Sequence, residues 1–128
     1  MPRDPLPEDV RRFILTSVPS VPFLEALFIY REARGEPVPP TQLSRRLYIS
    51  ETLAAQVIEQ LVAARFVMPA DELGVGHRFA PEEGVAAMVE QLAAFYRSHL
   101  VEVTSLIHSR TGRMAQQFAD AFKLRKDS

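Results

Sequence analysis

The spacing of apolar residues predicts two helices near the N-terminus. Pro7 suits a first helical position, an acidic pair follows it, and apolar side chains then recur on one side until Pro19 ends the pattern. We therefore expect a first helix over about residues 7–17. Ser20 can cap a second helix, in which apolar residues repeat at helical spacing on most sides until Gly35. Because so much of its surface is apolar, this second helix should be buried.

After a proline-rich break, the pattern becomes that of two helices joined at a tight turn. Leu43 and Leu47 share one face of a short helix, and Ile49 fills the turn. Ser50 is placed to cap the helix that follows. The stripe along that helix predicts four buried side chains, those of Leu53, Val57, Ile58 and Leu61.

A short β-hairpin is predicted after this pair of helices. Residues 66–68 have the pattern of a strand, residues 71–76 that of a polar turn containing glycine, and residues 77–80 that of the returning strand. The sequence therefore indicates a mostly α fold with a small β-hairpin wing, followed by long C-terminal helices.

The region after Pro81 carries an unusually long apolar stripe. If it is continuous to about Ser109, it forms a helix of about 27 residues and about 40 Å, more than a small domain can cover. Apolar positions in this stripe fall on two rows with seven-residue spacing, which two helices can share. We therefore predict a homodimer, with a bundle within one chain as the alternative. The candidate interface residues are Val85, Val89, Leu92, Tyr96, Val103 and Leu106.

A last amphipathic segment follows the interruption at Thr111 and Gly112. Its apolar residues are Met114, Phe118, Ala121 and Phe122, and a basic end comes after them. This segment could dock on its own chain, exchange with a partner subunit, or bind a groove of another protein. Docking on its own chain is the interpretation we prefer.

Residues 43–67 resemble the helix-turn-helix and first wing strand of winged-helix transcription factors of the MarR-like and GntR-like kind. The resemblance rests on Leu43, Leu47, Ile49, Ser50, Leu53, Val57, Leu61, Arg65, Phe66 and Val67. It implies a homodimeric, DNA-binding transcriptional regulator whose second helix enters a major groove about 12 Å wide. The chain then divides into a flexible arm (1–6), a winged helix-turn-helix domain (7–81) and a helical dimerisation or interaction segment (82–128).

The resemblance also implies which side chains would meet DNA. Thr52 and Gln56 could read bases, since glutamine can form a bidentate pair with adenine. Arg45, Arg46 and Arg78 could hold phosphates. The full candidate set is Arg45, Arg46, Ser50, Thr52, Gln56, Gln60 and Arg78.

Charge supports an alternative function. The chain has 15 basic and 16 acidic residues and a formal net charge of −1, whereas a strong nucleic-acid binder carries a basic excess. The outward face of the second helix presents Glu51 and Glu59, and the hairpin turn contains Asp71 and Glu72. The alternative is therefore a winged-helix protein–protein interaction module that does not bind DNA.

The residues of common catalytic and metal sites are missing from the sequence pattern. Cysteine is absent, which excludes thiolate nucleophiles and sulfur-ligated metals. His99 and His108 fall on nearly opposite faces of one helix, and the glycines form no phosphate-binding motif. We therefore expect a protein that is not an enzyme and has no cofactor or metal. The lack of cysteine and of an apolar run of roughly 18 residues predicts a cytoplasmic protein without a membrane span.

Overall fold

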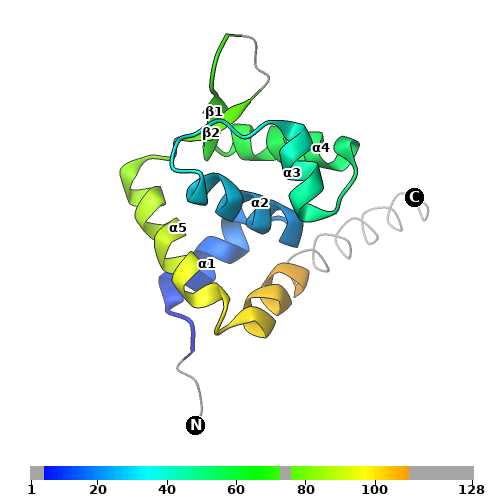
Figure 1. Cartoon of the computed structure of the whole chain (residues 1–128). Helices are drawn as coiled ribbons and strands as arrows, with labels where there is room; N and C mark the ends of the chain where they lie inside the picture. Colours follow the sequence, from blue (N-terminus) through cyan, green and yellow to red (C-terminus); the bar gives the residue numbers. More distant parts are fainter. Residues whose placement is uncertain (1–4, 73–75, 110–128) are drawn as a thin grey trace, which may run out of the picture.

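The computed structural model describes residues 5–72 and 76–109 of the chain (Figure 1). The elements run in the order α1 (Glu8–Ser17), α2 (Val21–Glu32), α3 (Pro40–Leu47), α4 (Glu51–Ala63), β1 (Val67–Pro69), β2 (His77–Phe79) and α5 (Glu83–Tyr96). A further helical stretch covers residues 100–109. The predicted fold class is confirmed, because the structure is mostly helical and its two strands form a small antiparallel hairpin.

The central helix of the fold is α2. The Oγ atom of Ser20 accepts a hydrogen bond from the backbone N–H of Phe23 at 3.2 Å, as a capping residue should. The helix ends before Arg34 and Gly35, which both have positive φ angles of 51° and 89°. Figure 1 shows α2 in the middle of the molecule, between α1 and the α3–α4 pair. Its buried residues are Phe23, Leu24, Ala26, Leu27, Ile29 and Tyr30.

An aromatic cluster connects three parts of the chain at the centre of the core. The ring of Phe66, which follows α4, meets the rings of Phe13 in α1 and Phe23 in α2 edge to face. The two ring-centroid distances are 6.0 and 5.9 Å, within the range that favours such pairs. These contacts hold α1 and the end of α4 against the same helix.

The turn between α3 and α4 is closed by two serine side chains. The Oγ atom of Ser44 donates to the carbonyl oxygen of Ile49 at 2.8 Å, and the Oγ atom of Ser50 accepts from the N–H of Leu53 at 3.0 Å. Tyr48 lies between them in the left-handed region, with φ 56° and ψ 42°. The predicted helix pair and its cap are therefore confirmed.

The hairpin is fixed to the helices by a contact that the sequence pattern did not reveal. Val67 pairs with Phe79, and Pro69 pairs with His77. Val38, in the link between α2 and α3, forms an isolated bridge to His77. The Val38 N–H donates to the His77 carbonyl at 2.8 Å, and the His77 N–H donates back at 3.3 Å. This bridge attaches β2 to the chain that leads into α3.

The prediction that Leu53 is buried is wrong. Leu53 is 37% exposed, whereas its neighbour Ala54 is fully buried. The inward face of α4 consists of Ala54, Val57, Ile58 and Leu61, so the apolar stripe begins one residue later than predicted. An alanine adds little to a hydrophobic pattern, and the stronger signal of the adjacent leucine misplaced the start of the stripe.

The apolar stripe after Pro81 does not form the single helix of about 27 residues that a continuous stripe would give. Helix α5 ends at Tyr96, residues 97–99 form a turn, and the helical stretch 100–109 follows. The Ser98 hydroxyl donates to the Phe95 carbonyl at 3.2 Å, a local bond of the kind that competes with regular helix. Because of the turn, buried residues on both sides of it, such as Leu92 and Val103, belong to the same core.

The left-handed backbone conformation of Tyr48 should make the turn between α3 and α4 less stable than a glycine at this position would. We expect Tyr48→Gly to be about 1 kcal/mol more stable than Tyr48→Ala, because a Cβ atom is strained in the left-handed region. The side chain itself is 96% exposed and contributes little packing. Denaturant unfolding of both variants measures this difference. Equal midpoints would contradict the backbone geometry of the turn.

Substitutions of two leucines on α4 test which face of this helix is buried. Leu61 has no exposed surface, so Leu61→Ala should lower the free energy of unfolding by about 2–5 kcal/mol. Leu53→Ala should cost less than about 1 kcal/mol, because this side chain is partly exposed. Chemical denaturation measures the free energy of unfolding of both variants. A larger loss for Leu53→Ala than for Leu61→Ala would contradict the observed inward face of α4.

Candidate interaction surface

The outer face of α4 is exposed, as predicted. Thr52, Gln56 and Gln60 lie along this face, four residues apart, and all three are exposed. Glu51 and Glu59 are exposed on the same helix. The face is therefore polar and carries carboxylates, without a basic side chain between residues 51 and 63.

Ser50, another candidate for DNA contact, has a structural role. Its Oγ atom accepts the hydrogen bond from Leu53 N–H that caps α4. An N-cap serine of this kind stabilises its helix by about 1 kcal/mol. Although the residue is exposed, its side chain is already used by the fold.

Two of the three candidate arginines contact other side chains of the fold. Arg46, in the last turn of α3, places its Nη2 atom 3.6 Å from the Oε2 atom of Glu32. The Nη2 atom of Arg78 donates to the sulfur of Met68 at 3.0 Å, across the hairpin ladder. Successive strand residues point to opposite faces, so Arg78 points away from the face that His77 presents to α4. Arg45 is exposed and has no ion pair with any described residue.

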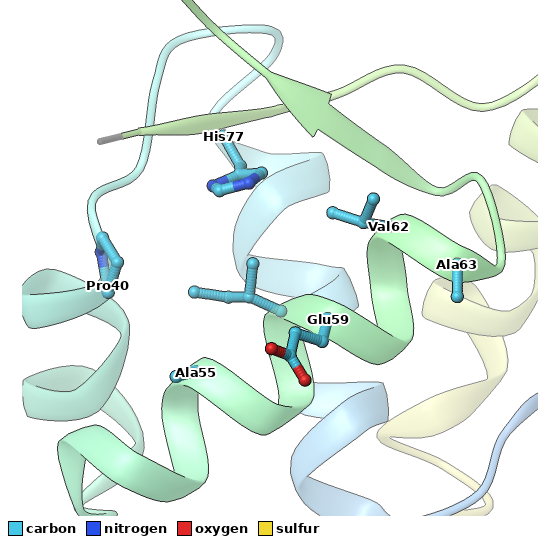
Figure 2. A pocket seen from close by; sticks show the side chains of 7 residues that line it. Pro40, Ala55, Glu59, Val62, Ala63 and His77 are labelled. Atoms are coloured by element: carbon cyan, nitrogen blue, oxygen red, sulfur yellow. The ribbon is translucent and has the colours of Figure 1, made fainter. Parts of the chain in front are cut away.

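An open apolar groove lies between α4, β2 and the start of α3 (Figure 2). It has a volume of about 460 Å³ and is lined by Pro40, Ala55, Ile58, Glu59, Val62, Ala63 and His77. Figure 2 shows Ala55, Glu59 and Val62 on α4 and His77 on the strand above them. Glu59 is the one acidic residue of the lining, and none of the lining residues is Arg or Lys.

Sequence reasoning missed this groove, although α4 contains a signal for it. Ala55, Val62 and Ala63 are apolar and exposed on the helix side next to the hairpin. Three exposed apolar residues on the side of α4 next to the hairpin are the signal in the sequence that could have indicated this groove. The opposite wall could not be inferred, because it depends on the bridge between Val38 and His77.

His77 forms one wall of the groove, and its imidazole ring is uncharged near neutral pH. Burial lowers the pKa of His77 from its ordinary value of 6.5. Its Nδ1 atom is buried and has no hydrogen-bond partner among the described residues. Near neutral pH, the charge at the groove is therefore the negative charge of Glu59.

The residues predicted for a dimer interface are used largely by the core of one chain. Val89, Leu92 and Val103 have no exposed surface, so they cannot also meet a second molecule. The other three, Val85, Tyr96 and Leu106, are partly buried against the same core. The ring of Tyr96 lies 5.2 Å from that of Phe28 in α2. The predicted docking of Met114, Phe118, Ala121 and Phe122 lies outside the described residues.

An ion pair between α2 and α5 borders a second, polar pocket. The Nε and Nη2 atoms of Arg31 each donate to a Glu90 carboxylate oxygen at 2.7 Å. This bidentate contact lowers the pKa of Glu90 from its ordinary value of 4.5. Glu32 and Arg34 complete the pocket, which has a volume of about 240 Å³. Glu32 is in turn close to Arg46, and none of the four residues that line this pocket lines the groove.

Comparisons with protein-family models, with curated proteins and with solved structures find no match to this chain. Within residues 5–72 and 76–109, no three His, Asp or Glu side chains come together as a metal site would require. In the same ranges, no single helix is long and apolar enough to cross a membrane. Among the described helices, α1 and α2 taken together have the length and apolar composition of a membrane span, but a bend of 111° separates them.

His77 should make stability depend on pH. Its pKa is lower in the folded protein than in the unfolded chain, so the unfolded chain binds more protons as the pH falls below about 6.5. We expect the free energy of unfolding to decrease between pH 8 and pH 5.5, and this decrease to be smaller in His77→Gln. Glu90 titrates below this range.

Denaturant unfolding of both proteins at the two pH values measures the effect. An equal loss of stability in the variant, or a gain on acidification that His77→Gln removes, would contradict the burial of this imidazole.

Proposed function

We propose that this chain is a winged-helix protein-interaction module that binds a helix of another protein in the groove beside α4. The observation that carries this proposal is the apolar groove itself, on the helix that would otherwise face DNA. An amphipathic helix binds such a groove by inserting apolar side chains spaced three or four residues apart. Burying those side chains supplies the affinity.

The charges around the groove indicate the chemistry of the partner. Glu59 lines the groove and Glu51 is exposed in the first turn of the same helix. A partner helix with basic residues beside its apolar face would be attracted, and an acidic one repelled. Arg46 lies close to Glu32, which further limits the positive charge available near α4. We therefore propose a basic amphipathic helix as the partner.

DNA binding by a homodimer is the second candidate, and one arrangement favours it. Thr52 and Gln56 are exposed one turn apart on α4, and Arg45 makes no ion pair with a described residue. These groups could supply base and phosphate contacts. The acidic side chains on the same face oppose it, because affinity for phosphates grows with the number of basic contacts. Protein binding is therefore the better-supported function.

A photo-crosslinking amino acid placed at Ala55 tests the proposal in the cell that makes this protein. We expect irradiation to join the chain to one predominant protein, identified by mass spectrometry together with the linked peptide. Val62→Glu should reduce the product at least tenfold, because it places a charge in the apolar groove. Ala87→Glu, at an exposed position of α5, is the matched control and should leave the product unchanged.

Selection from a pool of genomic DNA fragments at low and high salt tests the second candidate. Enrichment of a palindromic motif that weakens with salt and with Gln56→Ala would favour the DNA-binding function. If nothing is enriched and Ala55 joins to one protein, protein binding stands. The absence of both results would overturn both candidates.

A further inference from the structure

We infer that the groove beside α4 binds the C-terminal segment of this chain itself, residues 110–128, through Phe118 and Phe122. This inference rests on the proposed function, since it assumes that the groove accepts the apolar face of a helix. It names the first occupant of that site as a segment of the chain, which an external partner must displace.

The charges of the two parts of the chain are complementary. Residues 1–109 contain fourteen acidic and ten basic side chains, which gives a formal charge of −4. Residues 110–128 contain five basic and two acidic side chains, which gives +3. The two lysines of the chain, Lys123 and Lys126, both belong to this second part. Opposite charges favour association between the segment and the rest of the chain.

The apolar residues of the segment also fit the groove. Met114, Phe118 and Phe122 are spaced four residues apart, the spacing of groove-binding helices. Most of the groove lining is aliphatic, and its volume of about 460 Å³ is within the range of clefts that bind largely apolar ligands. The basic residues come directly after Phe122, so they can meet carboxylates such as Glu59 at the edge of the groove.

Attachment to the same chain gives the segment an advantage over a free partner. A flexible tether of matching length holds a ligand at an effective concentration in the millimolar range. A free helix of equal intrinsic affinity therefore cannot displace the segment at micromolar concentration. The segment would limit access to the groove to partners that bind it far more tightly.

The absence of cysteine from the chain allows a direct test by engineered disulfides. We expect the double variant Ala55→Cys/Ala121→Cys to form a disulfide under mild oxidation, because the bond requires Cβ atoms about 3.5–4.5 Å apart. The matched control Ala87→Cys/Ala121→Cys places the first thiol on α5, outside the groove, at an alanine that is also exposed. The groove pair should be oxidised at least ten times faster than the control pair.

Two further measurements make the result specific. Adding Val62→Glu to the groove pair should reduce its oxidation rate to that of the control, and unfolding in denaturant confirms that this variant is folded. A non-reducing gel shows whether the disulfide joins residues of one molecule or of two. Either product places the segment in the groove, and the second would also supply a dimer interface.

Equal oxidation of the groove and control pairs, or of the groove pair with and without Val62→Glu, would overturn the inference. Photo-crosslinking at Ala55 separates this failure from failure of the proposed function. If Ala55 still joins to another protein in the cell while the disulfide does not form, the groove binds a partner but not the C-terminal segment. If neither product appears, both proposals fall.

Discussion

Burial of α2 is the constraint on which the rest of the structure depends. This helix is apolar on most sides, and six of its residues are buried. Each fully buried large apolar side chain contributes about 1.5–3 kcal/mol, so the other helices must cover α2 from several directions. Because α3 and α4 both pack on it, their inner faces are fixed. The outer face of α4 remains exposed.

The groove results from a second constraint, the attachment of β2 to the link between α2 and α3. The backbone groups of Val38 and His77 bond to each other, and Val38 is itself buried. This contact holds the His77 ring opposite α4 and closes one wall of the groove. A hairpin joined to the fold only through Phe66 and Val67 would leave the side chains of Val62 and Ala63 without this neighbour.

Features with strong local signals could be predicted from the sequence. Ser20 and Ser50 cap their helices as expected, and the exposed positions of Thr52 and Gln56 followed from helical spacing. Local signals failed where packing between distant segments decides the outcome. The turn at residues 97–99 lets the second half of the stripe return to the core. No proline or glycine marks this turn in the sequence.

At the candidate site, too, the features that depend on one helix could be predicted, and those that depend on packing between segments could not. Which polar residues of α4 are exposed depends on that helix alone. The contacts of the arginines and the walls of the groove depend on how several helices and strands pack together. Arg46 lies near Glu32 of α2, and Arg78 contacts Met68 of the neighbouring strand. Neither contact can be found from spacing along one element, although both involve side chains that were expected to meet phosphates.

The two candidate functions of α4 compete for the same space. A helix has a diameter of about 10 Å with its side chains, so one seated between α4 and β2 would cover Ala55 and Glu59 and lie beside Gln56. A DNA duplex could not approach that face at the same time. Electrostatics acts in the same direction, because a formal charge of −4 on residues 1–109 repels phosphates and attracts the basic C-terminal segment. A helix bound in the groove would therefore exclude DNA from α4, and the charge distribution favours the proposed occupation of the groove.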